Sequence, residues 1–389
     1  MITGQPSVQE AVLDHRERIA RIALARSAGI GPVLYFRLLA RFGSARTALE
    51  ALPRLVAAGR LPRVRPASPA DAARELERAA RLAVHVVLHG EPGYPERLRE
   101  LEDPPPVVVL AGRRELLGRP SVAVVGARNA SANGRAFAAE LARELADAGV
   151  CVVSGLARGI DAAAHEGALA GPGSTLAVLA SGIDRPYPPE NAALMREIGT
   201  RGLLLSERPL GAEPRARHFP HRNRLIAALV AGVVVVEAAA RSGSLMTARL
   251  ALELGREVMA VPGTPLDPRH VGTNRLLREG AHLVERAEDV LAVLDSLPPA
   301  SFRAHRGQRS GGTGQAPQPP PERKAAAEDA ADGLEARLLA ALGPEPVGLD
   351  LLVRQCGRTA SEVQEALFTL ELEGLIDRHP GNRVSRRSG

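Results

Sequence analysis

The stretch that most restricts the fold is residues 121–149, SVAVVGARNASANGRAFAAELARELADAG. It combines a strand pattern, a tight loop and a helix pattern. Residues 122–125 are continuously apolar, which is typical of a parallel strand covered on both faces. After the loop, Phe137, Leu141 and Leu145 recur at every fourth residue, the spacing of a helix that packs on a sheet. The stretch therefore predicts one strand, loop and helix unit of an α/β domain.

The same unit repeats along the middle of the chain, where a domain is expected over residues 69–297. We expect strands near residues 84–88, 107–110, 122–126, 151–154, 175–180, 203–206, 233–237, 257–261 and 282–284. Strands that alternate with helices predict a doubly wound, mostly parallel α/β sheet with helices on both faces. A ligand of such a sheet lies over the carboxyl ends of its strands.

The N-terminal flank, residues 1–68, is predicted to form a helical domain. Residues 60–70 are rich in Pro and Arg and are expected to link it to the next domain. Its turn Gly29-Ile-Gly-Pro32 lies between two short helical patterns. In helix-hairpin-helix DNA modules such a turn presents backbone amides to a phosphate. The alternative is an ordinary helical bundle whose turn needs glycine.

The C-terminal flank divides into a tether and a small domain. Residues 298–332 are rich in Pro, Gly, Ser, Gln and charged residues, so we expect a flexible segment without a core. Residues 333–389 follow, with helix patterns at 334–342, 349–356 and 361–373 and a hairpin pattern at 375–384. Three helices and a hairpin predict a winged helix. Its third helix is acidic, so groove reading is not expected of it, and a protein contact is the alternative.

Charge and composition favour a polyanionic partner. The 389 residues carry a formal charge of +6 and a sequence pI of about 10.2. Lys324 is the only lysine, which excludes a Walker A motif and a Schiff-base lysine, while arginine suits bidentate phosphate contacts. A GC-rich genome would explain the arginines equally well. With 2% aromatic residues and no tryptophan, an extended stacking platform is excluded, so phosphate contacts must supply most of the affinity.

The sequence also indicates where the protein resides. Cys151 and Cys356 are far apart in apolar surroundings, which predicts no disulfide and favours a reducing compartment. The N-terminus lacks the apolar core of a signal peptide, and the longest apolar run, residues 225–236, is too short to span a bilayer. We therefore expect a soluble, cytoplasmic protein without a membrane partner.

Four loops are expected to meet at the carboxyl edge of the sheet, and the first two carry arginines. The first begins at Gly126, whose backbone lies at a strand end, and adds the full charge of Arg128. In the second, Arg158 is available to an anion, whereas Asp161 is expected to be the N-cap of a helix. These two loops predict an anion-binding edge.

The other two loops add an aromatic ring and hydroxyl groups. Residues 181–191 carry Tyr187, which either stacks on a base or lies on the neighbouring prolines. Residues 241–247 start a helix directly after a strand, so that the helix amides and Ser242 form another anion-binding nest.

The most basic cluster is residues 215–224, RARHFPHRNR, which also opens a helix. A phenylalanine and an asparagine among arginines suit backbone phosphates together with a stacked or edge-read base. The alternative is a solvated charged face. The residues of this cluster expected to bind DNA are Arg217, His218, Phe219, Arg222, Asn223 and Arg224.

Patterns for catalysis or metal binding are absent from the sequence. HExxH, GxSxG and paired cysteines do not occur, and the ten histidines do not fall at metal-ligand spacings. Asp184 and Asp267 could converge on the site with Glu207 and Glu237. The two glutamates close apolar strands, where a carboxylate commonly caps a loop or pairs with an arginine. We therefore expect no enzyme activity, no cofactor and no metal.

Seven segments together closely resemble the DNA-processing protein A family, also called Smf. They are VAVVGARNASANGR, VVSGLARGIDAAAHEGAL, DRPYPPEN, LLLSERPLG, HFPHRNRLIA, VVVVEAAARSGSLMTARLALELGREVMAVPG and GTNRLLREGAHLV, in the family's order and spacing over about residues 90–290. The resemblance implies an extended Rossmann-like domain that binds single-stranded DNA as a homodimer, without catalysis. It also implies help in loading the RecA recombinase during natural transformation.

The resemblance carries over a basic pocket formed by Arg128, Phe219, Arg222, Asn223 and Arg224. Arg158 and Ser242 are added from the loop pattern. Ala127 stands where the family commonly has a hydroxyl residue, which puts one side-chain contact to phosphate in doubt. The helical N-terminus and the winged helix resemble the family's variable flanking domains.

A rival hypothesis is a nucleotide-processing enzyme. RSGSLMTARLALE loosely resembles the PGGxGTxxE motif of phosphoribohydrolases, which are built on a related fold. That motif places a glutamate where this chain has Arg249, and Glu253 follows one turn later. A third hypothesis is a regulator that binds DNA through the winged helix.

Overall fold

The computed structural model describes residues 14–172, 174–297, 328–342, 346–379 and 382–387. The described residues form two compact units, one of residues 14–49 and 66–297 and one of residues 50–65 and those from 328 onward. Most of the predicted tether, up to residue 327, lies outside the described residues.

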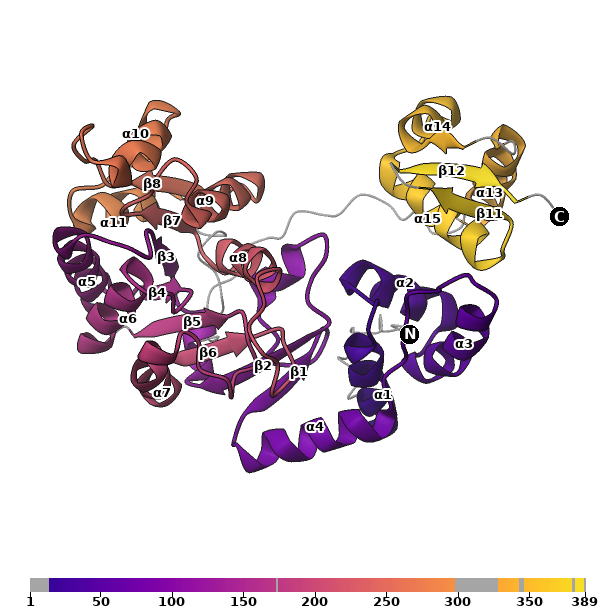
Figure 1. The fold of residues 1–389 in the computed structure, drawn as a ribbon, viewed down its shortest axis with the longest axis horizontal. Helices are drawn as coiled ribbons and strands as arrows, with labels where there is room; N and C mark the ends of the chain where they lie inside the picture. The colour runs from indigo at the N-terminus through magenta and orange to yellow at the C-terminus, as the bar shows by residue number, and fades with distance from the viewer. Residues whose placement is uncertain (1–13, 173, 298–327, 343–345, 380–381, 388–389) are drawn as a thin grey trace, which may run out of the picture. The chain divides into compact units, whose positions relative to one another are not determined.

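The larger unit is built around a nine-stranded sheet of order β1-β2-β6-β5-β4-β3-β7-β8-β9 (Figure 1). The strands are β1 (His85–Leu88), β2 (Val107–Gly112), β3 (Ser121–Val125), β4 (Cys151–Ser154), β5 (Thr175–Leu179), β6 (Leu203–Ser206), β7 (Gly232–Val235), β8 (Glu257–Ala260) and β9 (His282–Leu283). Each predicted strand is present, with ends within two residues of those expected.

Helices connect the strands. They are α5 (Ala132–Asp147), α6 (Ile160–Ala170), α7 (Ala192–Arg201), α8 (His218–Leu229), α9 (Gly243–Glu253), α10 (Val271–Arg278) and α11 (Ala287–Asp295), with short 3-10 helices η1 (Glu96–Glu100), η2 (Arg114–Gly118), η3 (Pro189–Asn191) and η4 (Pro268–His270). The predicted doubly wound α/β class is confirmed.

The order of the strands places a crevice beside β3. The chain moves outward from β3 through β4, β5 and β6, and then returns through α8 to β7 on the other side of β3. All strands from β3 to β9 are parallel to one another, whereas β2 runs antiparallel to both of its neighbours, β6 and the edge strand β1. Loops that leave β3 and β7 diverge at this reversal, and such a switch point is where doubly wound sheets bind ligands.

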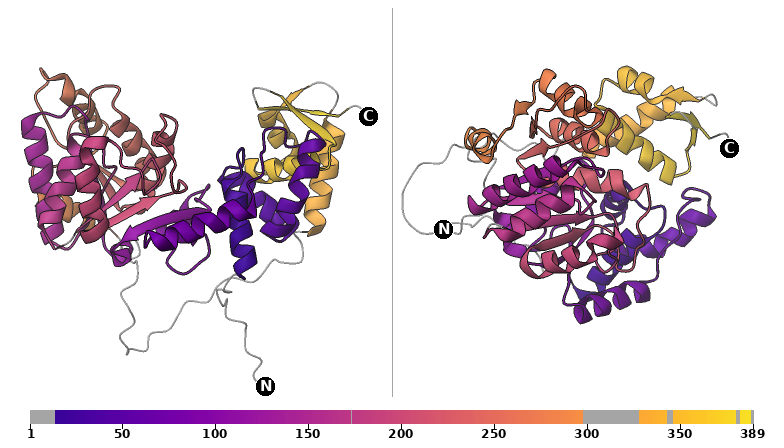
Figure 2. Two further views of the ribbon diagram at one scale, coloured as in Figure 1. Left: turned by 60° about the horizontal axis from the view of Figure 1, so that its bottom comes forward. Right: turned by 60° about the vertical axis from the view of Figure 1, so that its left-hand side comes forward.

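Both faces of the sheet are covered, because alternate residues of a strand point to opposite faces. Val122 and Val124 of β3 pack in the core formed with α5, α6 and α11, whereas Ala123 and Val125 pack in the core formed with α8, α9 and α10. Figures 1 and 2 show these two helical layers. The continuous apolar run of β3 follows from this burial on both sides.

The N-terminal helices are α1 (His15–Arg26), α2 (Pro32–Phe42), α3 (Ala45–Ala57) and α4 (Pro69–Arg81). Ile22 of α1 and Ala79 of α4 share one apolar core with β1 and β2. The boundary predicted after residue 68 falls inside this packed region, since the Ala67 N–H donates to Ser27 Oγ at 2.9 Å. The α1 and α4 helices are therefore continuous with the sheet domain, an arrangement that the linker-like composition of residues 60–70 does not indicate.

The smaller unit contains α13 (Glu328–Ala341), α14 (Leu349–Cys356) and α15 (Ala360–Leu372), with a three-stranded sheet of β10 (Val347–Gly348), β11 (Ile376–His379) and β12 (Arg383–Arg386) in the order β10-β12-β11. Leu338, Leu352 and Leu367 are fully buried in a core of its own. The predicted winged helix is confirmed. Across the parts of the chain that the structure describes, no helix has both the length and the apolar character needed to cross a membrane.

Candidate nucleic-acid interface

Two adjoining cavities open at the carboxyl ends of β3, β4, β5 and β7. The larger has a volume of about 700 Å³ and lies in the crevice between the loops after β3 and β7. The smaller has a volume of about 410 Å³ and lies between the loops after β4 and β5. Both are lined by Arg128, Asn129, Ala157 and Phe219, and we call the two cavities together the cleft. The four predicted loops meet here.

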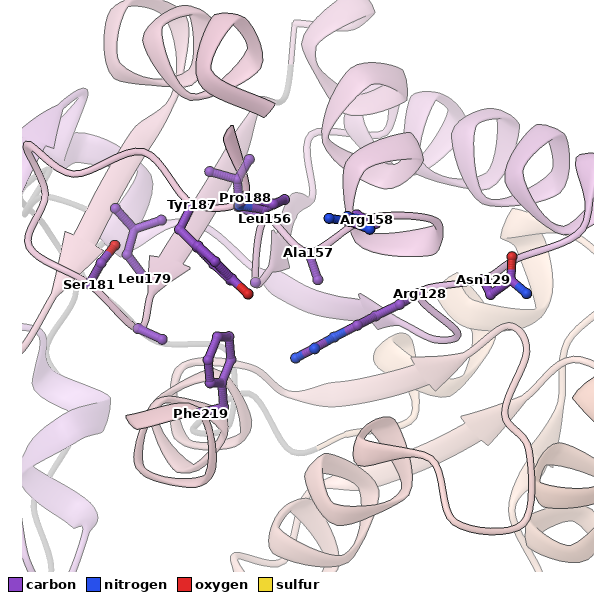
Figure 3. A pocket seen from close by; sticks show the side chains of 12 residues that line it. Arg128, Asn129, Leu156, Ala157, Arg158, Leu179, Ser181, Tyr187, Pro188 and Phe219 are labelled. Atoms are coloured by element: carbon purple, nitrogen blue, oxygen red, sulfur yellow. The ribbon is translucent and has the colours of Figure 1, made fainter. Parts of the chain in front are cut away.

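Arg128 and Phe219 line both cavities, and Tyr187 lies beside them in the smaller one. Arg128 Cζ lies 5.0 Å from the centre of the Phe219 ring, within the range of a cation–π contact. The Tyr187 ring meets Phe219 edge to face, with centroids 5.7 Å apart and an interplanar angle of 61°. Figure 3 shows the three side chains reaching into the same space from three separate elements. A cation and two aromatic rings are thus offered side by side.

A buried carboxylate holds the first loop in place. Glu237, which follows β7, is 1% exposed and accepts hydrogen bonds from the Ser131 N–H at 2.9 Å and from the Ser131 hydroxyl at 2.5 Å. Ser131 Oγ also accepts from the Gly134 N–H at 2.8 Å and so caps α5. A Cβ at Gly134 would lie 2.5 Å from the Glu237 carboxylate, so this approach requires glycine. The predicted capping role of Glu237 is confirmed, and Arg128 is presented from a fixed loop.

Arg158 lines the smaller cavity as an exposed residue. Its guanidinium forms an ion pair with Glu190 of η3, and both side chains are largely exposed. Exposed pairs of this kind contribute little to stability, so the arginine can exchange Glu190 for another anion.

Asp161 departs from its expected position. Gly159, not Asp161, is the N-cap of α6. The buried Asp161 carboxylate accepts from the N–H groups of Gly155 at 3.1 Å and Ala157 at 3.3 Å. Asp161 therefore orders the second loop instead of capping the helix.

Arg222, which the sequence analysis places among the residues expected to bind DNA, is buried. It is 5% exposed, and its Nη1 donates to the Val178 carbonyl at 3.1 Å. A Cβ at Gly155 would overlap the guanidinium, so the arginine packs against the backbone of the second loop. Burial lowers the pKa of Arg222, and the nearby Asp161 carboxylate opposes that change. Arg222 forms part of the wall of the larger cavity and supports Phe219, whose ring centre lies 6.0 Å from its Cζ.

Arg224, which was expected in the basic pocket, lies outside the linings of both cavities. Its Nη1 donates to the carbonyl and carboxylate oxygens of Asp103 at 2.8 and 3.1 Å, and its Nη2 donates to Glu207 Oε2 at 2.9 Å. Arg224 and Glu207 are each 11% exposed. Glu207 also pairs with Arg208 at 2.7 Å, so its predicted pairing with an arginine is confirmed.

The first residues of α8 also differ from expectation. His218 is buried, and its Nδ1 contacts the Ala180 carbonyl at 3.1 Å, which ties the start of α8 to the end of β5. Burial lowers the pKa of His218, and nearby arginines lower it further. Arg217 is the N-cap of α8, exposed but outside both cavity linings. Neither side chain belongs to the cleft surface.

The fourth loop closes the larger cavity. Ser242 is the N-cap of α9 and exchanges a hydrogen bond of 2.7 Å with Ser244. Asn223 Nδ2 donates to the Gly243 carbonyl at 3.4 Å and joins α8 to this loop. Gly126, at the end of β3, lines the same cavity.

Some polar residues of the cleft were not singled out from the sequence. Asn129 lines both cavities, and Arg241 and Arg269 line the larger one. Asn129 and Arg241 are adjacent to predicted site residues in the first and fourth loops, so their positions in these loops could have indicated that they line the cleft. Arg269 comes from η4, is paired with Asp267 at 2.6 Å and carried no comparable signal.

The lining offers little for acid–base or metal chemistry. Asp161 is the only carboxylate among the described residues that line the two cavities. Glu253 is the last residue of α9 and is exposed, ten residues after Gly243 and therefore roughly 15 Å along the helix axis. No group of three or more His, Cys, Asp or Glu residues in the described ranges is arranged to hold a metal ion.

Three family models match the chain. DNA recombination-mediator protein A matches residues 85–295, the DprA-like N-terminal HHH domain matches residues 15–78, and the DprA winged helix domain matches residues 318–382. Protein Smf of Synechocystis sp. is 36% identical over 319 residues, which cover 76% of this chain and 79% of the relative. Protein Smf of Escherichia coli is 37% identical over 311 residues, which cover 78% of each chain.

Two solved structures are similar in fold. The X-ray structure of DNA processing protein A from Streptococcus pneumoniae has a TM-score of 0.60 and 32% identity, and covers 72% of this chain and 98% of that chain. A structure of DNA processing protein A from Helicobacter pylori, described for its unique single-stranded DNA binding mode, has a TM-score of 0.50 and 32% identity. That match covers 54% of this chain and 95% of the other.

Proposed function

Because the chain belongs to the DNA recombination-mediator protein A family, we propose that it binds single-stranded DNA in the cleft and acts there as a recombination mediator. The observation that carries the proposal is the contact of Arg128 with Phe219 at the junction of the two cavities. A cation beside an exposed ring allows one nucleotide to place its phosphate on the cation and its base on the ring.

The phosphates of the strand are assigned to the polar side chains of the cleft. Arg128, Arg158 and Arg241 are exposed cations in its lining. Ser242 and the backbone at Gly126 add hydrogen-bonding groups at a helix N-terminus and a strand end. Asn223 is assigned to a base edge. The contacts of the arginines with phosphate neutralise backbone charge without reading sequence.

The bases are assigned to the aromatic half of the cleft. Tyr187 is 40% exposed and Phe219 is partly exposed, so an unpaired base can reach both. In a duplex the base faces are stacked on their neighbours and are not available to these rings. We therefore expect preference for single strands and little base specificity.

No catalytic step is part of the proposal. The phosphoribohydrolase motif needs a carboxylate beside its glycine-rich nest, and Glu253 lies at the opposite end of α9 from Ser242. Incubation with nucleoside monophosphates should therefore release no free base. Turnover that Glu253→Gln abolished would replace this proposal with the enzymatic one.

The proposed partners are the RecA recombinase and a second copy of the chain. We assign the dimer contact to β9, which pairs with β8 only among the described strands and exposes half of Leu283. Leu283→Arg should convert a dimer to a monomer in light scattering. RecA loading in the cytoplasm is tested by the rate of RecA filament growth on a strand that already carries this protein.

The principal test is a titration with single- and double-stranded oligonucleotides of equal length over a salt series. The single strand should bind more tightly, and its affinity should fall steeply with salt because phosphate contacts release counterions. Equal or tighter binding of the duplex would count against the assignment.

A further inference from the structure

We propose that α1 and α4 position the aromatic half of the cleft, through two chains of ion pairs and hydrogen bonds that end on α8 and on the loop carrying Tyr187. This inference rests on the proposed binding of single-stranded DNA, and it gives the N-terminal helices a part in that binding. Neither helix contributes a residue to the lining of the cleft among the described residues. The two helices therefore act on the cleft by positioning its aromatic residues and not by lining it.

The first chain runs from α4 to α8. Glu75 of α4 binds Arg26 of α1 through two hydrogen bonds of 2.9 and 3.1 Å, and Arg26 Nη1 donates to the Glu207 carbonyl at 3.0 Å. The Glu207 carboxylate then holds Arg224 of α8. The Arg26 and Glu75 side chains are 14% and 10% exposed, so solvent screens this chain weakly.

The second chain runs from α4 to the loop at residues 181–191. Arg78 of α4 forms an ion pair with the Asp184 carboxylate, which is 11% exposed. The same carboxylate accepts from the Gly211 N–H at 2.7 Å, in the segment that leads into α8. One carboxylate thus ties α4 both to the Tyr187 loop and to the approach to α8.

The two chains end on the two elements that carry the rings. Arg224 lies about 1.4 turns after Phe219 on α8, and Asp184 lies in the same loop as Tyr187. The two rings meet at 5.7 Å, and a base can stack only where their separation and tilt are kept. A shift of about 1 Å in α8 or in the Tyr187 loop would change the separation and tilt of the two rings and so weaken stacking, because aligned contacts depend steeply on position.

Two variants interrupt the chains without removing a residue of the cleft. The double variant Arg26→Met/Glu75→Met replaces the buried pair with apolar side chains of similar length, a change that folded proteins often tolerate. Arg78→Met removes a side chain that is 45% exposed and leaves Asp184 bound to Gly211. Should the double variant fail to fold, Arg78→Met alone decides the second chain.

Each variant has a control that removes an arginine from the same helix. Arg18→Met/Glu91→Met removes another α1 pair, in which Arg18 binds Glu91 at 2.6 Å and the Val86 carbonyl at 2.6 Å, away from the cleft. Arg74→Met lies one turn before Arg78, and Arg74 pairs with Asp71 within α4. Each control removes charge from the same helix as its variant, but the residues it changes are not connected to the rings.

The measurement is the ratio of the affinity for an ordinary oligonucleotide to that for an abasic strand of the same length. One stacked base corresponds to a ratio of roughly five- to 150-fold. Both variants should lower this ratio at least threefold, with unchanged affinity for the abasic strand and an unchanged salt slope. The controls should keep the wild-type ratio. A general loss of folding would lower both affinities together and would not give this result.

The outcomes separate the two proposals. A wild-type protein that discriminates between the strands, with variants that keep its ratio, would overturn the positioning role and leave the DNA site standing. A wild-type protein that binds both strands equally would overturn the aromatic site and this inference together.

Discussion

The guanidinium of Arg128 lies over the ring of Phe219 at 5.0 Å, although the two residues are 91 positions apart in the sequence. One comes from the loop after β3 and the other from the first turn of α8. The salt dependence of binding distinguishes a phosphate contact made by the arginine from base stacking on the ring.

Arg128→Ala is expected to weaken single-strand binding by about 1.5–3 kcal/mol, the range for hydrogen bonds to a charged group. It should also reduce the slope of log affinity against log salt by about 0.7, the value for one phosphate contact on a single strand. Arg143→Ala, on the outer surface of α5, serves as the control and should change neither quantity. An unchanged slope for Arg128→Ala would contradict a phosphate contact.

Phe219→Ala should cost about 1–3 kcal/mol for each stacked base while the salt slope stays the same, because stacking releases no counterion. Phe219→Leu, which keeps the apolar bulk, should recover little of the affinity. Full affinity in Phe219→Leu would mean that the ring only fills space.

Arg224→Ala should act on stability and not on phosphate binding. Breaking a buried ion pair costs about 3–5 kcal/mol, and Arg208 still neutralises Glu207, so we expect about 3 kcal/mol in denaturant unfolding. The salt slope for single-stranded DNA should remain that of the wild type. A lowered slope without destabilisation would return Arg224 to the DNA site.

His165 should make the stability of the larger unit depend on pH. Its Nε2 accepts from the Leu156 N–H at 3.2 Å and its Nδ1 contacts Thr175 Oγ1 at 2.7 Å, and burial lowers the pKa of His165 to about 3, with a smaller effect from Arg222. In the unfolded chain His165 has a pKa of about 6.5, so between this pH and the folded pKa the unfolded state binds one more proton than the folded state. The contribution of His165 to stability is therefore complete above about pH 6.5. Below that pH the free energy of unfolding falls by up to about 1.4 kcal/mol per pH unit.

Denaturant unfolding at about pH 7 and pH 5 tests this dependence. His165→Gln, which cannot titrate, should show a smaller loss between the two pH values than the wild type. Equal losses in the two proteins would show that other groups are responsible.

Deletion of residues 298–389 should leave most single-strand binding intact, because every residue that lines the cleft belongs to the larger unit. The comparison uses the same salt series as Arg128→Ala. If the truncated chain lost most of its affinity while Arg128→Ala kept its own, the DNA site would lie in the winged helix.

The sequence by itself determined the strands of a mostly parallel sheet and the edge at which a ligand is expected. Both depend on local patterns, namely apolar runs such as residues 122–125 and the small-residue loops that follow them. Parallel strands end at one edge, so Arg128, Arg158 and Ser242 could be assigned to one cleft without knowledge of their distances. For the same local reason Glu207 and Glu237 were each expected to cap a loop or to pair with an arginine, and the structure decided which role each one takes.

Only the tertiary structure decided which residues of α8 reach the cleft. Successive residues of a helix point about 100° apart, so Phe219, Arg222 and Arg224 take different directions from one short segment. The packing of α8 on the sheet sets its rotation, which leaves Phe219 at the cavities, buries Arg222 against Gly155 and turns Arg224 toward Glu207. The partners that fix this rotation are distant in sequence, and for that reason the charge pattern of residues 215–224 did not reveal it.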